Sequence, residues 1–344
     1  MIGDVLTSSI LCEAIKVRFR ESEVHYLINT HTAAVVENNP HIDQLVLFTP
    51  EMEKNKKARN KLFQFLKNER YNAVIDVYSK LGSAKITKIT SATTRVGYYK
   101  WYTKWGYTRT FSYDKTPKTE AGLAIENRIK LLEPIANDFP PFLKPKIYLN
   151  KEEILNAEAT LLENGVDLSQ PIAMISLLGS SKDKTYPLQF MALLLDHISS
   201  RKNVQILLNY IPKQQSEVTK LLSLVKEDTK QQIFSSIYGK SLREFLAFTS
   251  HCSVMIGNEG GAINMAKALE IPTFSIFSPW ITREAWGLFE NEDNTSFHLK
   301  DIHPEIYENT SLKGIRKETS HFYNLMKPEQ VKESLEQFIK NHLL

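Results

Sequence analysis

The sequence has little cysteine, and it lacks the features that mark secreted and membrane-spanning proteins. Only two cysteines, Cys12 and Cys252, occur in 344 residues, which excludes a disulfide framework and a cysteine-rich zinc site. No apolar run approaches the roughly 18 residues that a spanning helix needs, and no signal-like segment opens the chain. These absences predict a protein of the cytoplasm, a reducing compartment.

Nucleotide and metal signatures are missing as well. The chain contains neither the GxGxxG fingerprint nor the GxxxxGK[ST] phosphate loop, so nothing favours a dinucleotide-dependent oxidoreductase or an NTP hydrolase. Its nine histidines form no HxH or HxxxH pair, and we therefore expect no metal site and no cofactor. The net charge of +4 is too small to argue by itself for a nucleic-acid partner.

The chain does have a globular composition with a regular alternation of helices and strands. Its 42% hydrophobic residues can fill two cores, and its length fits two domains. Helices alternate with short apolar strands before and after a proline-rich linker at residues 138–150, which is typical of parallel doubly wound sheets. We therefore predict an α/β protein with two Rossmann-like domains, residues 1–150 and 151–344, facing across a cleft.

Both ends of the chain carry helical patterns. Residues 5–20 have apolar positions at three- to four-residue spacing and basic residues in the last turn, which predicts an amphipathic helix. No strand precedes this helix, so we expect that the first strand of the domain is absent and that the native chain begins upstream of Met1. The final helix, residues 328–340, is opened by Pro328, and we expect that it can pack back on the first domain.

The first candidate site is the turn after the apolar strand at residues 253–258. Here Glu259, Gly260 and Gly261 lead directly into a helix. Glycines allow close approach of a ligand, the helix start offers free N–H groups, and Glu259 could accept hydrogen bonds from ribose hydroxyls. A tight strand-to-helix turn with a favourable acidic residue is the alternative.

The second candidate is the loop after the strand at residues 171–178. It contains Ser180, Ser181 and Lys184, and Pro187 opens the next helix. Hydroxyls and lysines at the carboxyl end of a strand suit a diphosphate. A solvated polar turn explains the same residues equally well.

Asp4 and an aromatic, basic stretch are the candidates in the first half. A carboxylate in the first turn of a helix is usually a cap, but one that lines a cleft can act as a general base. In residues 82–118, eight basic residues accompany Asp114 alone, with eight aromatic residues interleaved. That mixture could bind an anionic sugar or phosphate, a nucleic acid or a membrane surface, or it could be a partly buried hairpin with a solvated basic face.

In order along the chain, three segments together resemble the bacterial ADP-heptose:lipopolysaccharide heptosyltransferases, glycosyltransferase family 9. They are the opening IGDVLTSSILCEAIK, the NNPHIDQLVLF segment at residues 38–48, and residues 241–280, which contain IGNEGGAINMAKALEIPTFSIFSPW. KDKTYP at residues 182–187 adds to the match. The resemblance implies a GT-B architecture, with the acceptor held by the first domain and the donor by the second.

The resemblance also implies roles for individual residues. Asp4 would be the general base and Lys184 would bind the donor diphosphate, with Ser180 and Ser181 beside it. Glu259, Gly260, Gly261 and Asn264 match the nucleotide-binding stretch, where the family commonly has Asp, a hydroxyl residue and His in place of Glu259, Gly260 and Asn264. Because the aromatic, basic stretch falls in the acceptor domain, Lys100, Lys104 and Arg109 become candidates for acceptor binding.

The leading hypothesis is therefore an inverting, metal-independent glycosyltransferase. It would move a sugar, a heptose by resemblance, from a nucleotide-diphosphate donor to a lipopolysaccharide core or related surface glycan. The expected partners are the donor, an anionic glycolipid or oligosaccharide and the inner face of the cytoplasmic membrane, to which the protein could bind peripherally, with no nucleic acid. Two alternatives remain: a sugar-nucleotide epimerase on the same scaffold, and a non-catalytic protein that binds sugar nucleotides or glycans.

Overall fold

A computed structural model describes residues 2–201 and 203–343. The chain forms two compact units, residues 1–145 and 146–344. The division thus falls within the proline-rich linker, a few residues before the predicted boundary at 150. Among the described residues, no helix is long and apolar enough to cross a membrane.

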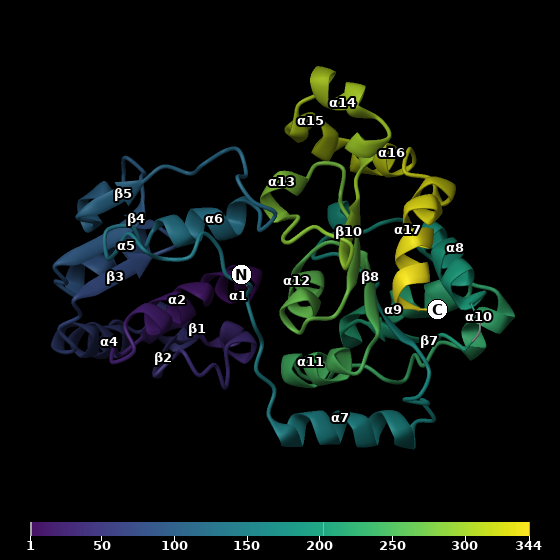
Figure 1. Cartoon of the computed structure of the whole chain (residues 1–344), viewed down its shortest axis with the longest axis horizontal. Coiled ribbons are helices and arrows are strands. Elements are labelled where there is room, and N and C mark those ends of the chain that lie inside the picture. The colour runs from purple at the N-terminus through teal and green to yellow at the C-terminus, as the bar shows by residue number, and fades with distance from the viewer. Residues whose placement is uncertain (1, 202, 344) are drawn as a thin grey trace. The chain divides into compact units, whose positions relative to one another are not determined.

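The first unit contains parallel strands and helices (Figure 1). Its elements are α1 (Ile2–Ser8), α2 (Ile10–Arg18), β1 (His25–Asn29), the 3₁₀ helix η1 (Thr30–Val35), β2 (Gln44–Phe48), α3 (Pro50–Lys54), α4 (Lys56–Asn68), β3 (Ala73–Asp76), α5 (Leu81–Ile89), β4 (Thr94–Tyr98), η2 (Lys104–Gly106), β5 (Arg109–Phe111) and α6 (Leu123–Lys130). The strands form two separate sheets, β1–β2 and β3–β4–β5. The pairing is parallel, as the alternation predicts, but within the described residues β1 pairs with β2 alone and is not joined to β3.

The predicted helix at residues 5–20 is interrupted. Three consecutive hydroxyls bond back to carbonyl oxygens one turn earlier: Thr7 to Gly3 at 2.8 Å, Ser8 to Asp4 at 2.6 Å and Ser9 to Leu6 at 2.7 Å. Such back-bonding competes with the helical ladder and bends helices. The chain accordingly forms α1 and α2 with a break at Ser9.

The second unit is built on one parallel sheet of five strands in the order β10-β9-β8-β6-β7. Its elements are α7 (Lys151–Glu163), β6 (Ile172–Ser176), η3 (Lys182–Lys184), α8 (Leu188–Ser199), β7 (Gln205–Asn209), η4 (Pro212–Gln214), α9 (Gln215–Leu222), α10 (Glu227–Gln231), α11 (Leu242–Ser250), β8 (Val254–Asn258), α12 (Gly261–Ala268), β9 (Thr273–Ile276), α13 (Arg283–Trp286), β10 (Asn294–Phe297), η5 (Leu299–Asp301), α14 (Pro304–Asn309), α15 (Leu312–Lys317), α16 (Thr319–Tyr323) and α17 (Pro328–His342). An isolated parallel bridge joins Ile206 of β7 to Ile233. With the segment around Ile233 as a sixth strand beside β7, the strand order is that of a Rossmann sheet.

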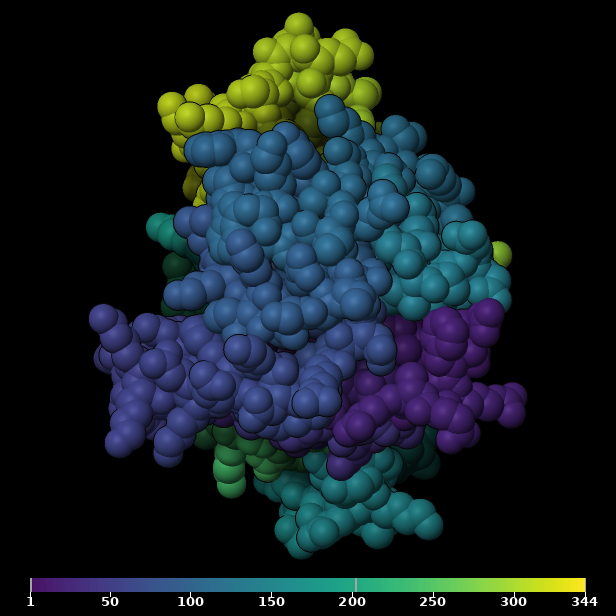
Figure 2. Space-filling view, turned by 90° about the vertical axis from the view of Figure 1, so that its left-hand side faces the viewer, coloured from purple at the N-terminus to yellow at the C-terminus, as the bar shows by residue number. Residues whose placement is uncertain are grey.

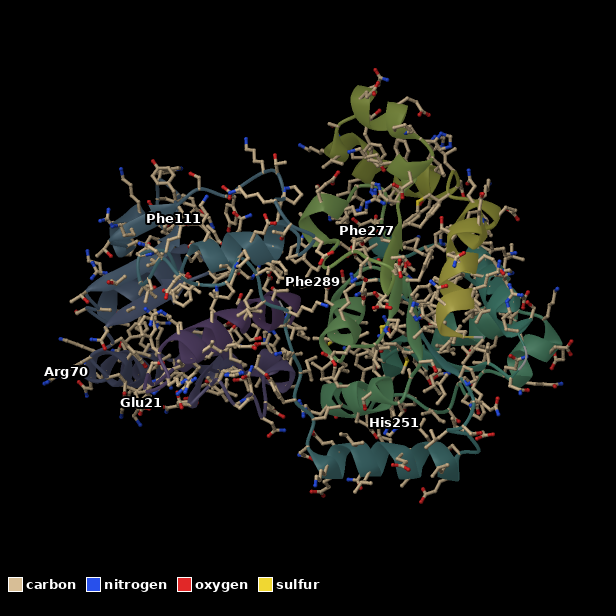
Figure 3. The ribbon with its side chains drawn as sticks, in the orientation of Figure 1. Glu21, Arg70, Phe111, His251, Phe277 and Phe289 are labelled. Atoms are coloured by element: carbon tan, nitrogen blue, oxygen red, sulfur yellow. The ribbon has the colours of Figure 1, made fainter. Side chains whose placement is uncertain are left out.

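Helices cover this sheet, and for that reason its central strands are continuous apolar runs. Every residue of β6 and of β8 is buried. Helices also pack on one another: His251, labelled in Figure 3, follows α11, and its Nε2 lies 3.1 Å from the Ile154 carbonyl oxygen of α7. The unit therefore presents the carboxyl ends of its strands on a rigid support.

The final helix packs within its own unit. α17 packs on α8 and contacts β10, both elements of its own unit. Val331, Leu335, Phe338 and Ile339 are buried in the core that also contains Phe274 of β9. Because these side chains form the apolar stripe of the helix, that stripe is already used within the second unit.

Candidate active site

The two candidate loops of the second unit follow neighbouring strands. β6 pairs with β7 on one side and with β8 on the other, so the strand order reverses at β6. In open α/β sheets, ligands bind outside the carboxyl ends of the strands at such a switch point. The loop at residues 177–187 follows β6, and the turn at Glu259–Gly261 follows β8, so the sheet brings the two together.

The first loop is held tightly. Its 3₁₀ turn, η3, contains Lys184, and a Cβ on Gly179 would lie 2.1 Å from the Lys184 carbonyl oxygen, so only glycine fits there. The Ser278 hydroxyl and the Trp280 indole N–H both donate to the Asp183 carbonyl oxygen, at 2.7 and 3.0 Å. The backbone around Lys184 is therefore fixed from two directions.

The second loop is a sharp strand-to-helix turn. Gly260 has a φ of +148°, a conformation that favours glycine, and it serves as the N-cap of α12. Glu259 immediately precedes it, and its backbone N–H donates to the Ile276 carbonyl oxygen of β9 at 3.0 Å. The free N–H groups of α12 thus begin beside the Glu259 carboxylate.

Lys184 and Glu259 form the polar centre of this site. Lys184 Nζ lies 3.5 Å from Glu259 Oε1, and it also lies 5.3 Å from the centroid of the Trp280 ring. The Glu259 side chain is almost completely buried, and this burial raises the pKa of its carboxyl, while the Lys184 charge opposes the rise. A cation next to a buried acid can exchange that acid for an incoming anion.

Asn258 is a site residue that the sequence reasoning missed. Its side chain is fully buried, accepts from the Tyr186 N–H at 2.7 Å, and donates to the carbonyl oxygens of Ser176 and Leu177 at 3.1 and 2.7 Å. It therefore ties the end of β8 to both ends of the Lys184 loop. The only signal in the sequence was an asparagine at the end of an apolar strand.

The other predicted donor residues lie on the same two loops. Ser180 and Ser181 are exposed, and the Ser181 hydroxyl donates to the Asp183 carboxylate. Gly261 is the first residue of α12, and the Asn264 N–H closes the first turn on the Gly260 carbonyl oxygen at 3.2 Å. The structure thus gathers the predicted donor residues of the second unit around one strand-end region.

In the first unit, Asp4 lies inside the first turn of α1, not at its cap, and has a long-range partner. Arg128 Nη2 of α6 lies 3.2 Å from Asp4 Oδ1, and Arg128 Nε donates to the Ser8 hydroxyl at 3.0 Å. The Arg128 side chain is 8% exposed and that of Asp4 is 36% exposed. A buried guanidinium therefore orients a carboxylate that solvent and ligands can reach.

The aromatic, basic stretch forms an exposed surface of the first unit. Trp101 is 78% exposed, and Tyr99, Tyr102 and Trp105 are also exposed. The segments around residues 75–115, in blue, occupy the centre of the face shown in Figure 2. Tyr98 and Tyr107 of the same stretch are buried, and its strands β4 and β5 pair in parallel, so the stretch is not a hairpin.

The three basic acceptor candidates lie at different places on this surface. Lys100 Nζ donates to the Tyr78 carbonyl oxygen at 3.3 Å. Lys104 belongs to η2, which packs on α5, and Arg109 is the first residue of β5.

Comparison with known proteins assigns the family. The family model of glycosyltransferase family 9 (heptosyltransferase) matches residues 59–313. The chain belongs to this family. Lipopolysaccharide heptosyltransferase 1 of Campylobacter coli is 25% identical over 283 residues, which cover 80% of this chain and 81% of that protein.

Solved structures show that this family 9 chain has the GT-B fold. A family 9 glycosyltransferase from Veillonella parvula superposes with a TM-score of 0.80 at 16% identity, covering 99% of this chain and 95% of that one. The E. coli ADP-heptose lipopolysaccharide heptosyltransferase II superposes with a TM-score of 0.72 at 15% identity, covering 99% and 96%. Membership of the family supports glycosyl transfer as the general activity.

Within residues 2–201 and 203–343, no group of three or more histidine, cysteine, aspartate or glutamate side chains is placed to hold a metal ion. At the ends of β6 and β8, Lys184 supplies a positive charge and the start of α12 supplies free N–H groups, which are chemically suited to an anion.

Proposed function

We propose that this chain is an inverting, metal-independent heptosyltransferase. It transfers a heptose from a nucleotide-diphosphate donor to a lipopolysaccharide core or a related surface glycan. The main support is the meeting of Lys184 and Glu259, 3.5 Å apart, at the ends of the neighbouring strands β6 and β8. A diphosphate site at a switch point needs a cation, free backbone N–H groups and an acceptor for sugar hydroxyls, and this place provides all three.

On the donor side, the diphosphate takes the place of Glu259 as the partner of the Lys184 ammonium. The N–H groups at Gly260 and Gly261 and the hydroxyls of Ser180 and Ser181 complete its surroundings. Lys184 then stabilises the charge that develops on the leaving nucleoside diphosphate as the bond between the sugar carbon and the phosphate oxygen breaks. Glu259, released from Lys184, accepts hydrogen bonds from ribose hydroxyls, and Asn264 stands one turn into α12.

On the acceptor side, Asp4 is the general base. The acceptor hydroxyl attacks the anomeric carbon from the face opposite the leaving group, and its proton passes to the Asp4 carboxylate. One carbon–oxygen bond forms as the other breaks, so the configuration is inverted. Arg128 holds the carboxylate in position, and its charge keeps an acidic group stable in a half-buried place.

The surface of the first unit supplies the contact with the acceptor and with the membrane that carries it. Lys100, Lys104 and Arg109 bind anionic groups of the glycolipid. Aromatic side chains with basic neighbours are typical of protein surfaces at the membrane–water boundary, so Trp101 and Tyr102 would lie at the inner face of the cytoplasmic membrane. The protein then acts as a peripheral cytoplasmic enzyme.

Two substitutions test the donor and acceptor roles separately. Asp4→Asn should lower kcat by about 10²- to 10⁴-fold and leave the donor Kd unchanged, with Glu21→Gln, an exposed carboxylate of the same unit, as the control. Lys184→Gln should raise the donor Kd and lower kcat, while Lys182→Gln, on the same turn, should do neither. Kinetics with ADP-heptose and calorimetry with ADP provide both readouts.

Near wild-type turnover in Asp4→Asn would leave Asp4 a structural residue of α1 and refute its role as base. Consumption of the donor in the absence of any acceptor would favour a sugar-nucleotide epimerase. Donor binding without transfer to any acceptor would favour a non-catalytic binding protein.

A further inference from the structure

The second unit contains a pocket beside the Lys184 loop that has no role in the function proposed above. Its volume is about 390 Å³, and its walls come from the segment after β9, from α13 and from α15. In Figure 1, α13, α14, α15 and α16 gather at one end of the unit, above β10. Phe277, labelled in Figure 3, directly follows β9 and is buried.

The lining of the pocket combines aromatic faces with positive charge. Trp280 and Trp286 contribute indole rings, Leu312 an apolar side chain, and Lys313 and Arg316 cations. No acidic residue belongs to the lining. Three carboxylates lie nearby and all are paired: Glu284 with Lys300 at 3.2 Å, Asp301 with Arg283 at 2.7 Å, and Asp183 with Arg316 of the lining at 2.8 Å.

The two cations differ in how they are held. The Arg316 guanidinium lies 4.3 Å from the Trp280 ring centroid, and its Nε donates to the Asp183 carboxylate at 2.8 Å. These two contacts fix the plane of the guanidinium, although the Arg316 side chain remains 57% exposed. Lys313 is exposed, and among the residues that the structure describes it has no carboxylate partner. An oriented guanidinium and a mobile ammonium are a good pair for one carboxylate or phosphate.

Trp280 connects this pocket to the donor site. One indole contacts Arg316, donates to the Asp183 carbonyl oxygen at 3.0 Å and lies 5.3 Å from Lys184 Nζ. A ligand in the pocket would therefore lie one aromatic side chain away from the cation that meets the diphosphate. The loop that contains Lys184 therefore connects the pocket to the donor site, but the two remain separate sites.

We propose that this pocket binds an acidic sugar unit of the acceptor glycan, one that carries a carboxylate or a phosphate. A sugar ring offers an apolar face to the two indoles and hydroxyls to solvent, and its acidic group meets Lys313 and Arg316. The volume lies at the lower end of the range for small-molecule sites and suits one such unit. A neutral sugar of the donor would leave the Lys313 ammonium without a partner, so the charge favours an acidic unit of the acceptor as the ligand. The assignment to the acceptor rests on the function proposed above.

Tryptophan fluorescence can test the pocket in the full chain. In a Trp101→Phe/Trp105→Phe background, Trp280 and Trp286 are the remaining indoles. Glucuronic acid and glucose 6-phosphate should each change the emission in a saturable way, and neutral glucose should not. Lys313→Glu should weaken the binding of both acids about tenfold or more. Lys317→Glu, an exposed lysine of the same helix outside the lining, should not.

ADP distinguishes the pocket from the donor site. We expect ADP and glucose 6-phosphate to bind at the same time. Lys184→Gln should abolish the change in emission that ADP causes and retain the change that glucose 6-phosphate causes. Displacement of the sugar acids by ADP would overturn the proposal, because the pocket would then belong to the donor diphosphate. Equal responses to glucose, or equal losses in Lys313→Glu and Lys317→Glu, would overturn it too. Failure of ADP alone to bind would instead count against the donor site.

Discussion

Replacing Asn258 by alanine should both destabilise the second unit and loosen the Lys184 loop. The Asn258 amide makes three short hydrogen bonds, to the Tyr186 N–H and to the Ser176 and Leu177 carbonyl oxygens. All three partners are buried. Alanine at position 258 can replace none of these bonds, so each of these groups loses a partner on the protein side.

The size of the expected loss of stability follows from these three hydrogen bonds. Each buried polar group that is left without a partner lowers the free energy of unfolding by about 1–3 kcal/mol. The sum over the three groups is therefore the upper limit of the loss. Water entering the space of the lost amide can satisfy part of the demand. We therefore expect a loss of about 3 kcal/mol in the free energy of unfolding, or about 6–12 °C in Tm for a unit of this size. The donor KM should rise as well, since Tyr186 no longer anchors the end of the loop.

The assay is urea unfolding followed by the emission of Trp280 and Trp286 in the Trp101→Phe/Trp105→Phe background, so that the signal reports on the second unit. Asn309→Ala is the control, because this asparagine is exposed and bonds only within α14, to the Glu305 carbonyl oxygen at 2.9 Å. That variant should stay within about 0.5 kcal/mol of wild type. A loss below about 1 kcal/mol in Asn258→Ala, with an unchanged donor KM, would refute the reasoning.

Three further predictions concern buried groups. Arg128→Met should lower kcat about 10- to 100-fold in steady-state kinetics, because Asp4 loses its orienting partner. The donor Kd should not change, and a parallel loss of donor affinity would contradict the prediction. Burial lowers the pKa of His298 to about 4, so between pH 6.5 and 4 the unfolded chain binds more protons than the folded chain. The free energy of unfolding should therefore fall as the pH drops through this range. The urea midpoint of His298→Gln should fall less over the same range. Burial raises the pKa of the Cys12 thiol to about 12 and that of Cys252 further, so a disulfide reagent at neutral pH should label neither in the native protein and both in denaturing urea.

Local patterns predicted most of the regular elements. The strands β6 and β8 and the helix α17 lie within two residues of the predicted bounds 171–178, 253–258 and 328–340, because buried apolar runs and amphipathic periods are properties of short segments. The sequence reasoning missed β5, β10 and the short helices α13–α16. Each of these is only three to six residues long, too short for a period to emerge.

The sequence by itself determined the α/β class, the two-unit organisation and the glycine-rich turn at Glu259, since these depend on residue type and spacing along the chain. Only the tertiary structure decided which of these residues meet. Lys184 reaches Glu259 across 75 positions and Arg128 reaches Asp4 across 124, and Asn258 ties two strand ends together. Such contacts depend on strand pairing and helix packing, which place segments in space, whereas a period along the chain reports only the face on which a side chain lies.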